Sequence, residues 1–298
     1  MEPVQSQPAA SPTPSETTVA PARPERRTAP RTWETPPAPV SSPHLDDYQS
    51  IVGAAVIEEL RFLARDLKGR TVKMVNSTAV GGGVAEMLNR LVPLLGELEV
   101  ATHWDVITGG NDFFEVTKAF HNALHGSAYE LTRHAQEIFL SYNEQNRQRM
   151  QFNEDVVVIH DPQPAPLIRA RQDGPSRWVW RCHIDLSNPH PQVWGFLRPF
   201  IEQYDAAIVS SQSFARQLSI PQYLFYPCID PLSEKNKELE DSFVQKVCDE
   251  FGIDRSRPIV TQVSRFDRLK DPVGVVQAFK LARKICGLPT GAGGRRSE

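Results

Sequence analysis

The sequence predicts an α/β fold built on a parallel β-sheet. Short apolar runs, such as Val156-Val157-Val158-Ile159, alternate along the chain with longer stretches of helical periodicity. Strands that alternate with helices form right-handed βαβ units, in which the strands are parallel. A fully apolar run is typical of a strand buried on both faces, and a chain of 298 residues has room for two domains.

The first domain is expected to cover residues 46–230. Its opening helix is indicated by apolar residues at helical spacing: Ile51, Ala55, Ile57, Leu60, Leu63 and Leu67. Strands are expected at 71–76, 104–107, 156–159, 178–183 and 206–209. Helices are expected at 84–98, over most of 112–150, at 164–171 and at 193–204. This alternation predicts one parallel sheet with helices on its faces.

The start of a second domain is expected at residues 231–284. Its elements are a helix at 241–251, a strand at 259–263 and a helix at 272–283. The proline-rich segment 1–45 is expected to be disordered, because it has too few apolar residues to offset its chain entropy; a ligand for a proline-binding module is the alternative. Residues 285–298, rich in Gly and Arg, are expected to be an unstructured tail.

Composition excludes several classes of protein. The net charge is -3 with acids and bases mixed along the chain, which argues against binding to nucleic acid or to an anionic membrane. No apolar run approaches the roughly 20 residues of a membrane span, and no secretory leader is evident. The four cysteines are widely separated and form no CxxC pair, so a cytoplasmic protein without a zinc site or disulfide framework is expected.

The first strand ends in Asn76-Ser77-Thr78-Ala79-Val80 and the glycines Gly81, Gly82 and Gly83. Glycines allow close approach of a ligand to the backbone, and the helix that follows offers free N–H groups and a partial positive charge. The segment is neither GxGxxG nor a P-loop. A tight strand-to-helix turn without a ligand is the alternative.

Two further strands end in polar motifs. The run 156–159 is followed by His160-Asp161-Pro162-Gln163, and the next strand ends in Arg181-Cys182-His183-Ile184-Asp185, where period-2 alternation would place Arg181, His183 and Asp185 on one side. A carboxylate and an imidazole at the end of a buried strand need partners or a cleft, and Asp161 could accept hydrogen bonds from sugar hydroxyls. The alternatives are a helix cap at Asp161, structural histidines, or metal ligands without an accompanying motif.

The second-domain strand is followed by Ser264-Arg265-Phe266-Asp267-Arg268-Leu269-Lys270-Asp271-Pro272. Arg265 and Lys270 flank a loop just before a helix. A planar guanidinium and a compact ammonium together suit a diphosphate. The alternative is local charge balance with Asp267 and Asp271.

Together these motifs resemble the trehalose synthase/trehalose phosphorylase branch of the retaining glycosyltransferases, family 4, which has the GT-B fold. The stretch 111–118 and His121-Asn122-Ala123-Leu124 resemble the same branch, and the resemblance runs from about residue 48 to about Lys284. It implies two Rossmann-like domains facing across a cleft. The first would bind the acceptor sugar, and the second, incomplete here, would bind a nucleoside-diphosphate sugar.

The resemblance also implies roles for individual residues. Asp161 and His183 would hold sugar hydroxyls near the reacting carbon, and Gly82 and Gly83 would approach the donor phosphate or the transferred glucose. Arg265 and Lys270 would neutralise the leaving diphosphate, so these four polar residues form the expected catalytic set. The expected substrate-binding set also includes Asn76, Gln163, Arg181 and Asp185. No metal or cofactor is expected beyond the nucleoside-diphosphate glucose, which is a co-substrate.

The expected function is transfer of glucose from a nucleoside-diphosphate glucose to glucose, with retention, to make trehalose. After Lys284 the family would continue with further strands and helices, whereas this sequence turns into a Gly/Arg tail, so weak or absent turnover is expected of the chain alone. A non-catalytic sugar-binding remnant and a trehalose phosphorylase remain alternatives. The expected partners are small sugars and nucleotide sugars, and a homo-oligomer is left open.

Overall fold

The computed structural model describes residues 43–286 except 234, 258, 265 and 267. The chain separates into two compact units, with the division between Ile229 and Asp230. The first unit contains all the strands of the described residues. Residues 1–42 and 287–298 of the expected tails lie outside the described residues. The ends of both tails were placed wrongly, since Leu45 begins a 3-10 helix and residues 285–286 belong to the last helix.

A six-stranded sheet forms the centre of the first unit, in the order β2-β1-β3-β4-β5-β6. Every neighbouring pair is parallel, which confirms the predicted fold class. The strands are β1 (Thr71–Asn76), β2 (Ala101–Val106), β3 (Val156–His160), β4 (Arg177–Arg181), β5 (Ala206–Val209) and β6 (Gln222–Leu224). All six carboxyl ends therefore lie at one edge of the sheet.

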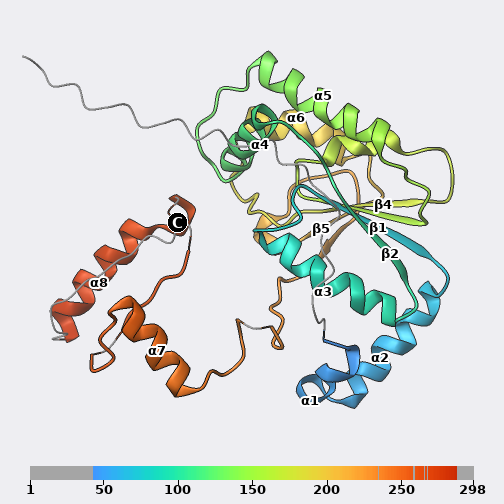
Figure 1. Ribbon diagram of the computed structural model, residues 1–298. Coiled ribbons are helices and arrows are strands. Elements are labelled where there is room, and N and C mark those ends of the chain that lie inside the picture. Colours follow the sequence, from blue (N-terminus) through green and yellow to red (C-terminus); the bar gives the residue numbers. More distant parts are fainter. Residues whose placement is uncertain (1–42, 234, 258, 265, 267, 287–298) are drawn as a thin grey trace, which may run out of the picture. The chain divides into compact units, whose positions relative to one another are not determined.

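Helices cover both faces of this sheet (Figure 1). One face packs against α3 (Gly83–Glu97), and the other packs against α4 (Asn111–Leu124), α5 (Arg133–Arg149), α6 (Pro191–Ile201) and the 3-10 helix η3 (Ala165–Ala170). The strand residues alternate between the two layers: Val72 and Met74 join the α3 side, whereas Val75 and Ile159 join the larger core.

The larger core is rich in aromatic side chains that are almost fully buried. Phe113, Phe120, Phe139, Trp178 and Trp180 are each at most 1% exposed, and Phe120 packs against Phe139 with ring centroids 5.1 Å apart. Burial of one large apolar side chain contributes about 1.5–3 kcal/mol. This core therefore holds β3 and β4 rigidly and fixes the positions of the residues that follow them.

The N-terminal helical segment differs from the expectation of one helix. It consists of η1 (Leu45–Tyr48), α1 (Gln49–Val52), α2 (Ala54–Ala64) and η2 (Arg65–Leu67). The break falls at Gly53, whose φ of +85° a glycine adopts readily. Of the six residues in the predicted apolar face only Ile57 is buried, and Leu63 is 55% exposed. None of the helices within residues 43–286 has the length and hydropathy needed to cross a bilayer.

The second unit contains α7 (Asp241–Phe251), η5 (Arg268–Lys270) and α8 (Pro272–Cys286). The predicted strand at 259–263 is wrong, since the described residues there have no regular structure and Val263 is 93% exposed. A strand requires a neighbour that accepts and donates its ladder hydrogen bonds, and the described part of this unit contains no other strand. Apolar composition alone therefore misled the prediction.

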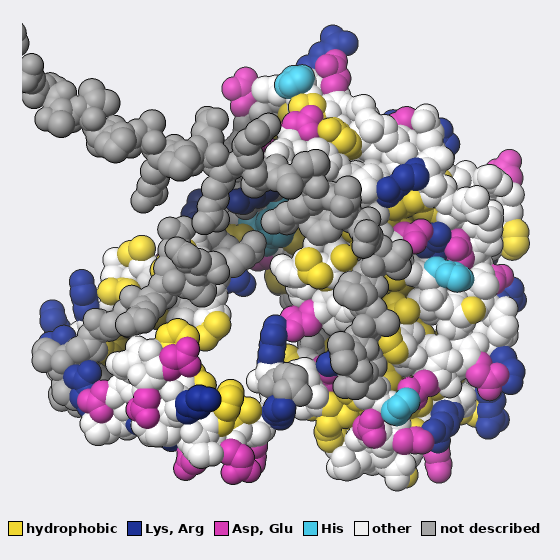
Figure 2. Space-filling model, in the orientation of Figure 1, with side chains coloured by type: hydrophobic (Ala, Val, Ile, Leu, Met, Phe, Trp, Pro, Cys, Tyr) yellow, Lys and Arg dark blue, Asp and Glu magenta, His cyan; other side chains and the backbone are white. Residues whose placement is uncertain are grey.

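Figure 2 shows acidic and basic side chains intermingled over the face in view, without one large area of a single sign. This distribution agrees with the small net charge of -3. It offers no broad electrostatic surface on that face.

Candidate functional site

Polar residues gather where β1, β3 and β4 end. Asn76 is the last residue of β1, and His160 and Arg181, the last residues of β3 and β4, are register partners. Eight of the ten predicted site residues lie at these three strand ends or in the segments that follow them. Lys270 is exposed in η5 of the second unit, and Arg265 lies outside the described residues. The carboxyl edge of a parallel sheet is the usual ligand-binding edge of such folds.

Asp161 joins the ends of β3 and β4. Its backbone N–H donates to the carbonyl of Arg181 at 2.8 Å, and its Oδ1 accepts from the backbone N–H of His183 at 2.8 Å. Its carbonyl accepts from the indole of Trp180 at 3.0 Å. The alternative that Asp161 caps the next helix is wrong, because η3 begins at Ala165 and the carboxylate turns toward His183 instead.

The backbone at Asp161 has a φ of +66°, in the left-handed region. Asp and Asn visit this region more readily than other side chains, at a cost of order 1 kcal/mol or more. The surrounding hydrogen bonds hold the residue there. Residues in such conformations cluster at ligand sites, where geometry matters more than local stability.

Burial raises the pKa of Asp161 to about 6, although the His183 amide and the Arg181 charge both lower it. Only one oxygen of this carboxylate has a hydrogen-bond partner among the described residues. The second oxygen can therefore accept a hydrogen bond from a ligand. A hydroxyl is the natural donor, because it satisfies the carboxylate without bringing in a second negative charge.

His160 and His183 form a hydrogen-bonded pair beside Asp161. The Nδ1 of His160 lies 2.9 Å from the Nε2 of His183, and the Nε2 of His160 lies 3.4 Å from the Sδ of Met74. Burial lowers the pKa of His160 to about 3, with further lowering by His183 and Arg181. Burial and the Arg181 charge lower the pKa of His183 to about 4. Both rings are therefore neutral at pH 7.

Arg181 is only 7% exposed, and it is held by the segment that follows β6. Its Nη2 donates to the carbonyl of Phe225 at 2.8 Å and to the Oγ of Ser210 at 3.4 Å. Its Nη1 is buried and has no partner among the described residues. The guanidinium stays charged, so it supplies a fixed positive potential that adds to the effect of burial in keeping both histidines neutral.

The expected alternation of Arg181, His183 and Asp185 on one side is wrong. The strand β4 ends at Arg181, two residues earlier than predicted, so period-2 geometry does not extend beyond it. Asp185 closes a turn, with its Oδ1 accepting from the backbone N–H of Ser187 at 2.7 Å. His183 reaches the site through its own bonds to Asp161 and His160.

The glycine segment forms the turn from β1 to α3. Gly81 has a φ of +77°, whereas Gly82 is the extended N-cap of α3 and supplies no side-chain cap. A Cβ placed on Gly83 would meet no atom within 4 Å. The N-terminus of this 15-residue helix is therefore uncapped by a side chain and sterically open, as an anion or hydroxyl ligand requires.

The side chain of Asn76 forms hydrogen bonds that hold the start of this turn. Its Nδ2 donates to the carbonyl of Thr78 at 2.8 Å, and its Oδ1 accepts from the indole of Trp104 at 2.9 Å. The side chain is 2% exposed. Asn76 thus contributes by fixing the glycine turn, and its predicted direct contact with substrate stays a prediction.

Gln163 lies two residues after Asp161 in the sequence, in the turn that leads into η3. Its carbonyl accepts from the Nδ2 of Asn143 at 3.1 Å, and its side-chain Oε1 is buried without a partner among the described residues. A buried amide oxygen without a partner costs about 1–3 kcal/mol unless water or a ligand satisfies it. The oxygen is therefore suited to a hydroxyl donor.

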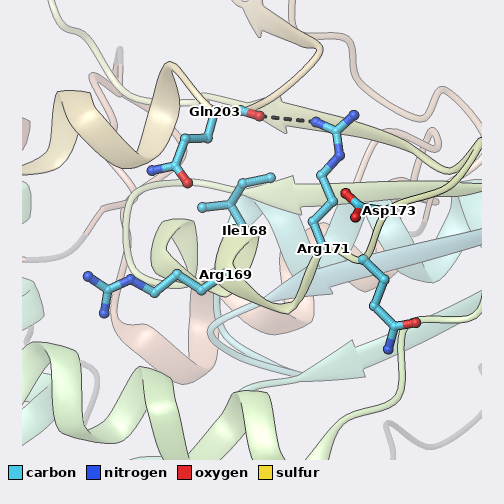
Figure 3. Close-up of a pocket in the computed structure, with 6 residues that line it drawn as sticks. Ile168, Arg169, Arg171, Asp173 and Gln203 are labelled. Atoms are coloured by element: carbon cyan, nitrogen blue, oxygen red, sulfur yellow. Dashed lines mark hydrogen bonds between the residues drawn. The ribbon is translucent and has the colours of Figure 1, made fainter.

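A hollow in the surface lies away from this site, near the residues where β4 and β5 begin. It is lined by Ile168, Arg169, Arg171, Gln172, Asp173 and Gln203. In Figure 3, Arg171 turns to the carbonyl of Gln203, to which it donates at 3.1 Å. Its other amino group is paired with Asp205 at 2.9 Å. The guanidinium of Arg171 therefore already has partners within the protein.

Within the part of the chain that the structure describes, no three His, Cys, Asp or Glu side chains gather in a way that could hold a metal ion. The His160–His183 pair is a hydrogen bond between two rings. The expectation that the reaction needs no metal stays a prediction.

No role for His160 is predicted from the sequence. The feature that could have identified it is its position at the end of a strand. His160 is the last residue of β3 and directly follows Ile159, which faces the larger core. Alternation then turns the His160 side chain to the α3 face, toward Met74. The contact with His183 depends on the loop after β4, which no sequence period predicts.

Residues 74–216 match the model of a family described as trehalose synthase, N-terminal domain. Trehalose synthase from Thermococcus litoralis is 42% identical over 244 residues, which cover 80% of this chain and 59% of the relative. Trehalose synthase from Rubrobacter xylanophilus is 41% identical over 251 residues, covering 82% and 60%. Trehalose phosphorylase from Pleurotus pulmonarius is 29% identical over 280 residues, covering 81% and 38%. The chain thus spans about three fifths of the length of the two synthases.

Proposed function

Because residues 74–216 match the model of the trehalose synthase N-terminal-domain family, we propose that the chain acts in glycosyl transfer of the trehalose-synthase type. In this reaction glucose passes from a nucleoside-diphosphate glucose to a second glucose, with retention at the anomeric carbon, to give trehalose. The first unit supplies the acceptor side of the site.

The observation that carries this proposal is the Asp161–His183–His160 group at the carboxyl edge of the sheet. It combines a carboxylate of raised pKa with two neutral imidazoles. Acceptor oxygens and ring nitrogens suit the hydroxyls of a sugar, which are strong donors. A site built to bind hydroxyls rejects analogues that lack them, because its buried polar groups would then be unpaired.

The remaining roles divide between sugar and phosphate. Asp161 and His183 hold hydroxyls of glucose near the reacting carbon, and the open N-terminus of α3 at Gly82 and Gly83 meets the transferred glucose or the donor phosphate. Arg265 and Lys270 neutralise the leaving diphosphate. Their charges oppose the negative charge that grows as the glycosidic bond breaks, which is an electrostatic form of catalysis. No protein nucleophile and no metal is assigned.

A trehalose phosphorylase is the second candidate. The similarity to the phosphorylase from Pleurotus pulmonarius supports it, and inorganic phosphate would then occupy the place of the diphosphate. The third candidate is a domain that holds glucose without transferring it, which needs only the residues of the first unit.

Calorimetric titration of the purified 298-residue chain with UDP-glucose, ADP-glucose and glucose, combined with assays for product, separates the three candidates. Trehalose formed from a nucleotide glucose supports the synthase. Release of glucose from trehalose only with phosphate supports the phosphorylase. Glucose binding without either product supports the binding domain, and no response to any sugar contradicts the proposal.

A further inference from the structure

The two site histidines meet edge to edge. Their ring planes differ by 11° and their centroids lie 5.2 Å apart, while His160 Nδ1 and His183 Nε2 are 2.9 Å apart. Rings stacked face to face at van der Waals separation, roughly 3.5 Å, could not bring two ring nitrogens this close. The contact is therefore an in-plane hydrogen bond, in which one ring donates N–H to the lone pair of the other.

The proton positions follow from the third member of the group. A neutral imidazole carries one N–H and one lone pair, and both rings are neutral at pH 7. The other nitrogen of His160, Nε2, faces the Sδ of Met74 at 3.4 Å. A thioether sulfur accepts hydrogen bonds weakly and cannot donate, so the N–H of His160 belongs on Nε2. Its Nδ1 then has only a lone pair and accepts from His183.

We propose that His160, anchored on Met74, is a positioning residue that holds His183 in the Nε2–H tautomer, so that Nδ1 of His183 presents a lone pair to a hydroxyl of the sugar. The hydroxyl ligand rests on the proposed function, whereas the tautomer rests on the protein alone. Among the described residues, Nε2 is the one ring nitrogen of His183 that has a hydrogen-bond partner. Asp161, whose Oδ1 accepts from the backbone N–H of His183, offers its second oxygen as a further acceptor.

This arrangement selects the ligand by its chemistry. A lone pair on Nδ1 and a carboxylate oxygen on Asp161 both need donors, which a sugar hydroxyl supplies. A phosphate oxygen would meet two acceptors and be repelled. The diphosphate therefore belongs elsewhere in the site, and the His183 side takes the sugar ring.

The tautomer can be observed directly. Two-bond ¹H–¹⁵N spectra of the full chain labelled with ¹⁵N-histidine distinguish a nitrogen that carries hydrogen from one that carries a lone pair. Spectra of His160→Asn and His183→Gln assign the two rings. The expected result at pH 7 is hydrogen on Nε2 and a lone pair on Nδ1 in both. Hydrogen on Nδ1 of His183 would overturn the inference and leave the proposed function untouched.

Three variants separate positioning from simple packing. His160→Asn can place an amide oxygen near the position of Nδ1 and keep the acceptor, whereas His160→Phe keeps a ring and removes both hydrogen bonds. Met74→Leu removes the weak acceptor with little change in volume. We expect His183 to keep its tautomer in His160→Asn and to become a mixture in His160→Phe and, to a smaller extent, in Met74→Leu.

Titration with glucose gives the functional readout. An equal mixture of tautomers leaves half of the molecules able to bind, and the apparent affinity falls by that fraction. His160→Phe should therefore bind glucose about twofold more weakly than His160→Asn. Equal affinity of these two variants would overturn the positioning role. If no variant responds to glucose while His183 shows the Nε2–H tautomer, the proposed sugar site fails and the positioning by His160 stands.

Discussion

The two edges of the same sheet treat their carboxylates in opposite ways. At the amino edge, Asp205 accepts from the backbone N–H of Trp178 at 2.7 Å and pairs with Arg171 at 2.9 Å. Although burial raises the pKa of Asp205, these partners lower it overall. At the carboxyl edge, the carboxylate of Asp161 has one hydrogen-bond partner among the described residues, the backbone N–H of His183, and burial raises its pKa to about 6.

The same contrast holds between the two ends of strand β3, which Asp155 precedes and Asp161 follows. Asp155, just before its start, accepts from the backbone and hydroxyl of Thr71 and from Arg70, and these bonds lower its pKa. A carboxylate whose two oxygens both have hydrogen-bond partners stabilises the fold. A buried carboxylate with one oxygen that lacks a partner, and with a perturbed pKa, is typical of a binding site. The comparison shows that the carboxyl edge is less stabilised than the amino edge, because its carboxylate keeps an oxygen that can accept a hydrogen bond from a ligand.

The largest effect is expected at the amino edge. Asp205→Ala should lower the free energy of unfolding by about 2–3 kcal/mol, because the Trp178 amide and the partly buried Arg171 lose their partner. Urea denaturation measures this change. Glucose binding should not change, and a loss of binding in a variant that still folds would show that the two edges are not separate.

The opposite sign is expected at the carboxyl edge. Asp161→Asn keeps the acceptor for the His183 amide and tolerates the positive φ, but it removes a charge that burial disfavours. A carboxyl group whose pKa is raised in the folded state destabilises the fold when ionised, fully above about pH 6. We therefore expect Asp161→Asn to raise the free energy of unfolding at pH 7 by about 1–2 kcal/mol. The gain should shrink by pH 4, and a large loss of stability at pH 7 would contradict it.

The histidine pair gives a pH dependence of the opposite sign. The pKa values of His160 and His183 are about 3 and 4 in the fold, and about 6.5 in the unfolded chain. The unfolded state thus binds more protons, and stability present above pH 6.5 is lost as the pH falls toward 4. Each histidine contributes about 1.4 kcal/mol per pH unit in that range, partly offset by Asp161.

His160→Asn removes one of these two contributions. Its free energy of unfolding should fall less steeply between pH 6.5 and 4.5 than that of the wild type, as urea denaturation at several pH values would show. An unchanged slope would mean that His160 already binds a proton in the folded protein.

The smallest effect concerns the glycine turn. Gly81→Ala should destabilise the fold by about 1 kcal/mol because of its positive φ. Gly83→Ala should leave the melting temperature unchanged, since its Cβ would meet open space. Thermal melts of both variants measure this. Equal destabilisation by the two substitutions would show that the N-terminus of α3 is not sterically open.

Much of the first unit was predictable from sequence. The strands at 71–76 and 206–209 coincide with β1 and β5, and the apolar run 156–159 falls within β3. The expected burial on both faces is reached only at Val157 and Ile159, since Val156 and Val158 are half-buried. The edge strand β6 was not predicted, since Gln222–Leu224 is exposed and carries no strong pattern. Parallel connectivity also predicts that Asp161 and His183, which follow neighbouring strands, lie near each other.

The details of the site were less predictable. Side chains alternate between the two faces of a sheet only within a strand, and β4 ends at Arg181. The prediction that His183 and Asp185 lie on the same face as Arg181 was therefore wrong. The contact of His160 with both Met74 and His183 arises from three segments that only the fold brings together. The positive φ at Asp161 likewise has no sequence signature beyond the tolerance of Asp for it.

The most direct test of the contrast between the two edges is a calorimetric titration of glucose into the wild-type chain, Asp161→Asn and Asp205→Asn at pH 7. A carboxylate that accepts from a sugar hydroxyl makes a charged hydrogen bond of about 1.5–3 kcal/mol, so Asp161→Asn should bind at least about tenfold more weakly. Asp205→Asn should bind as the wild type does. Wild-type affinity in Asp161→Asn would contradict the assignment of the carboxyl edge as the sugar site.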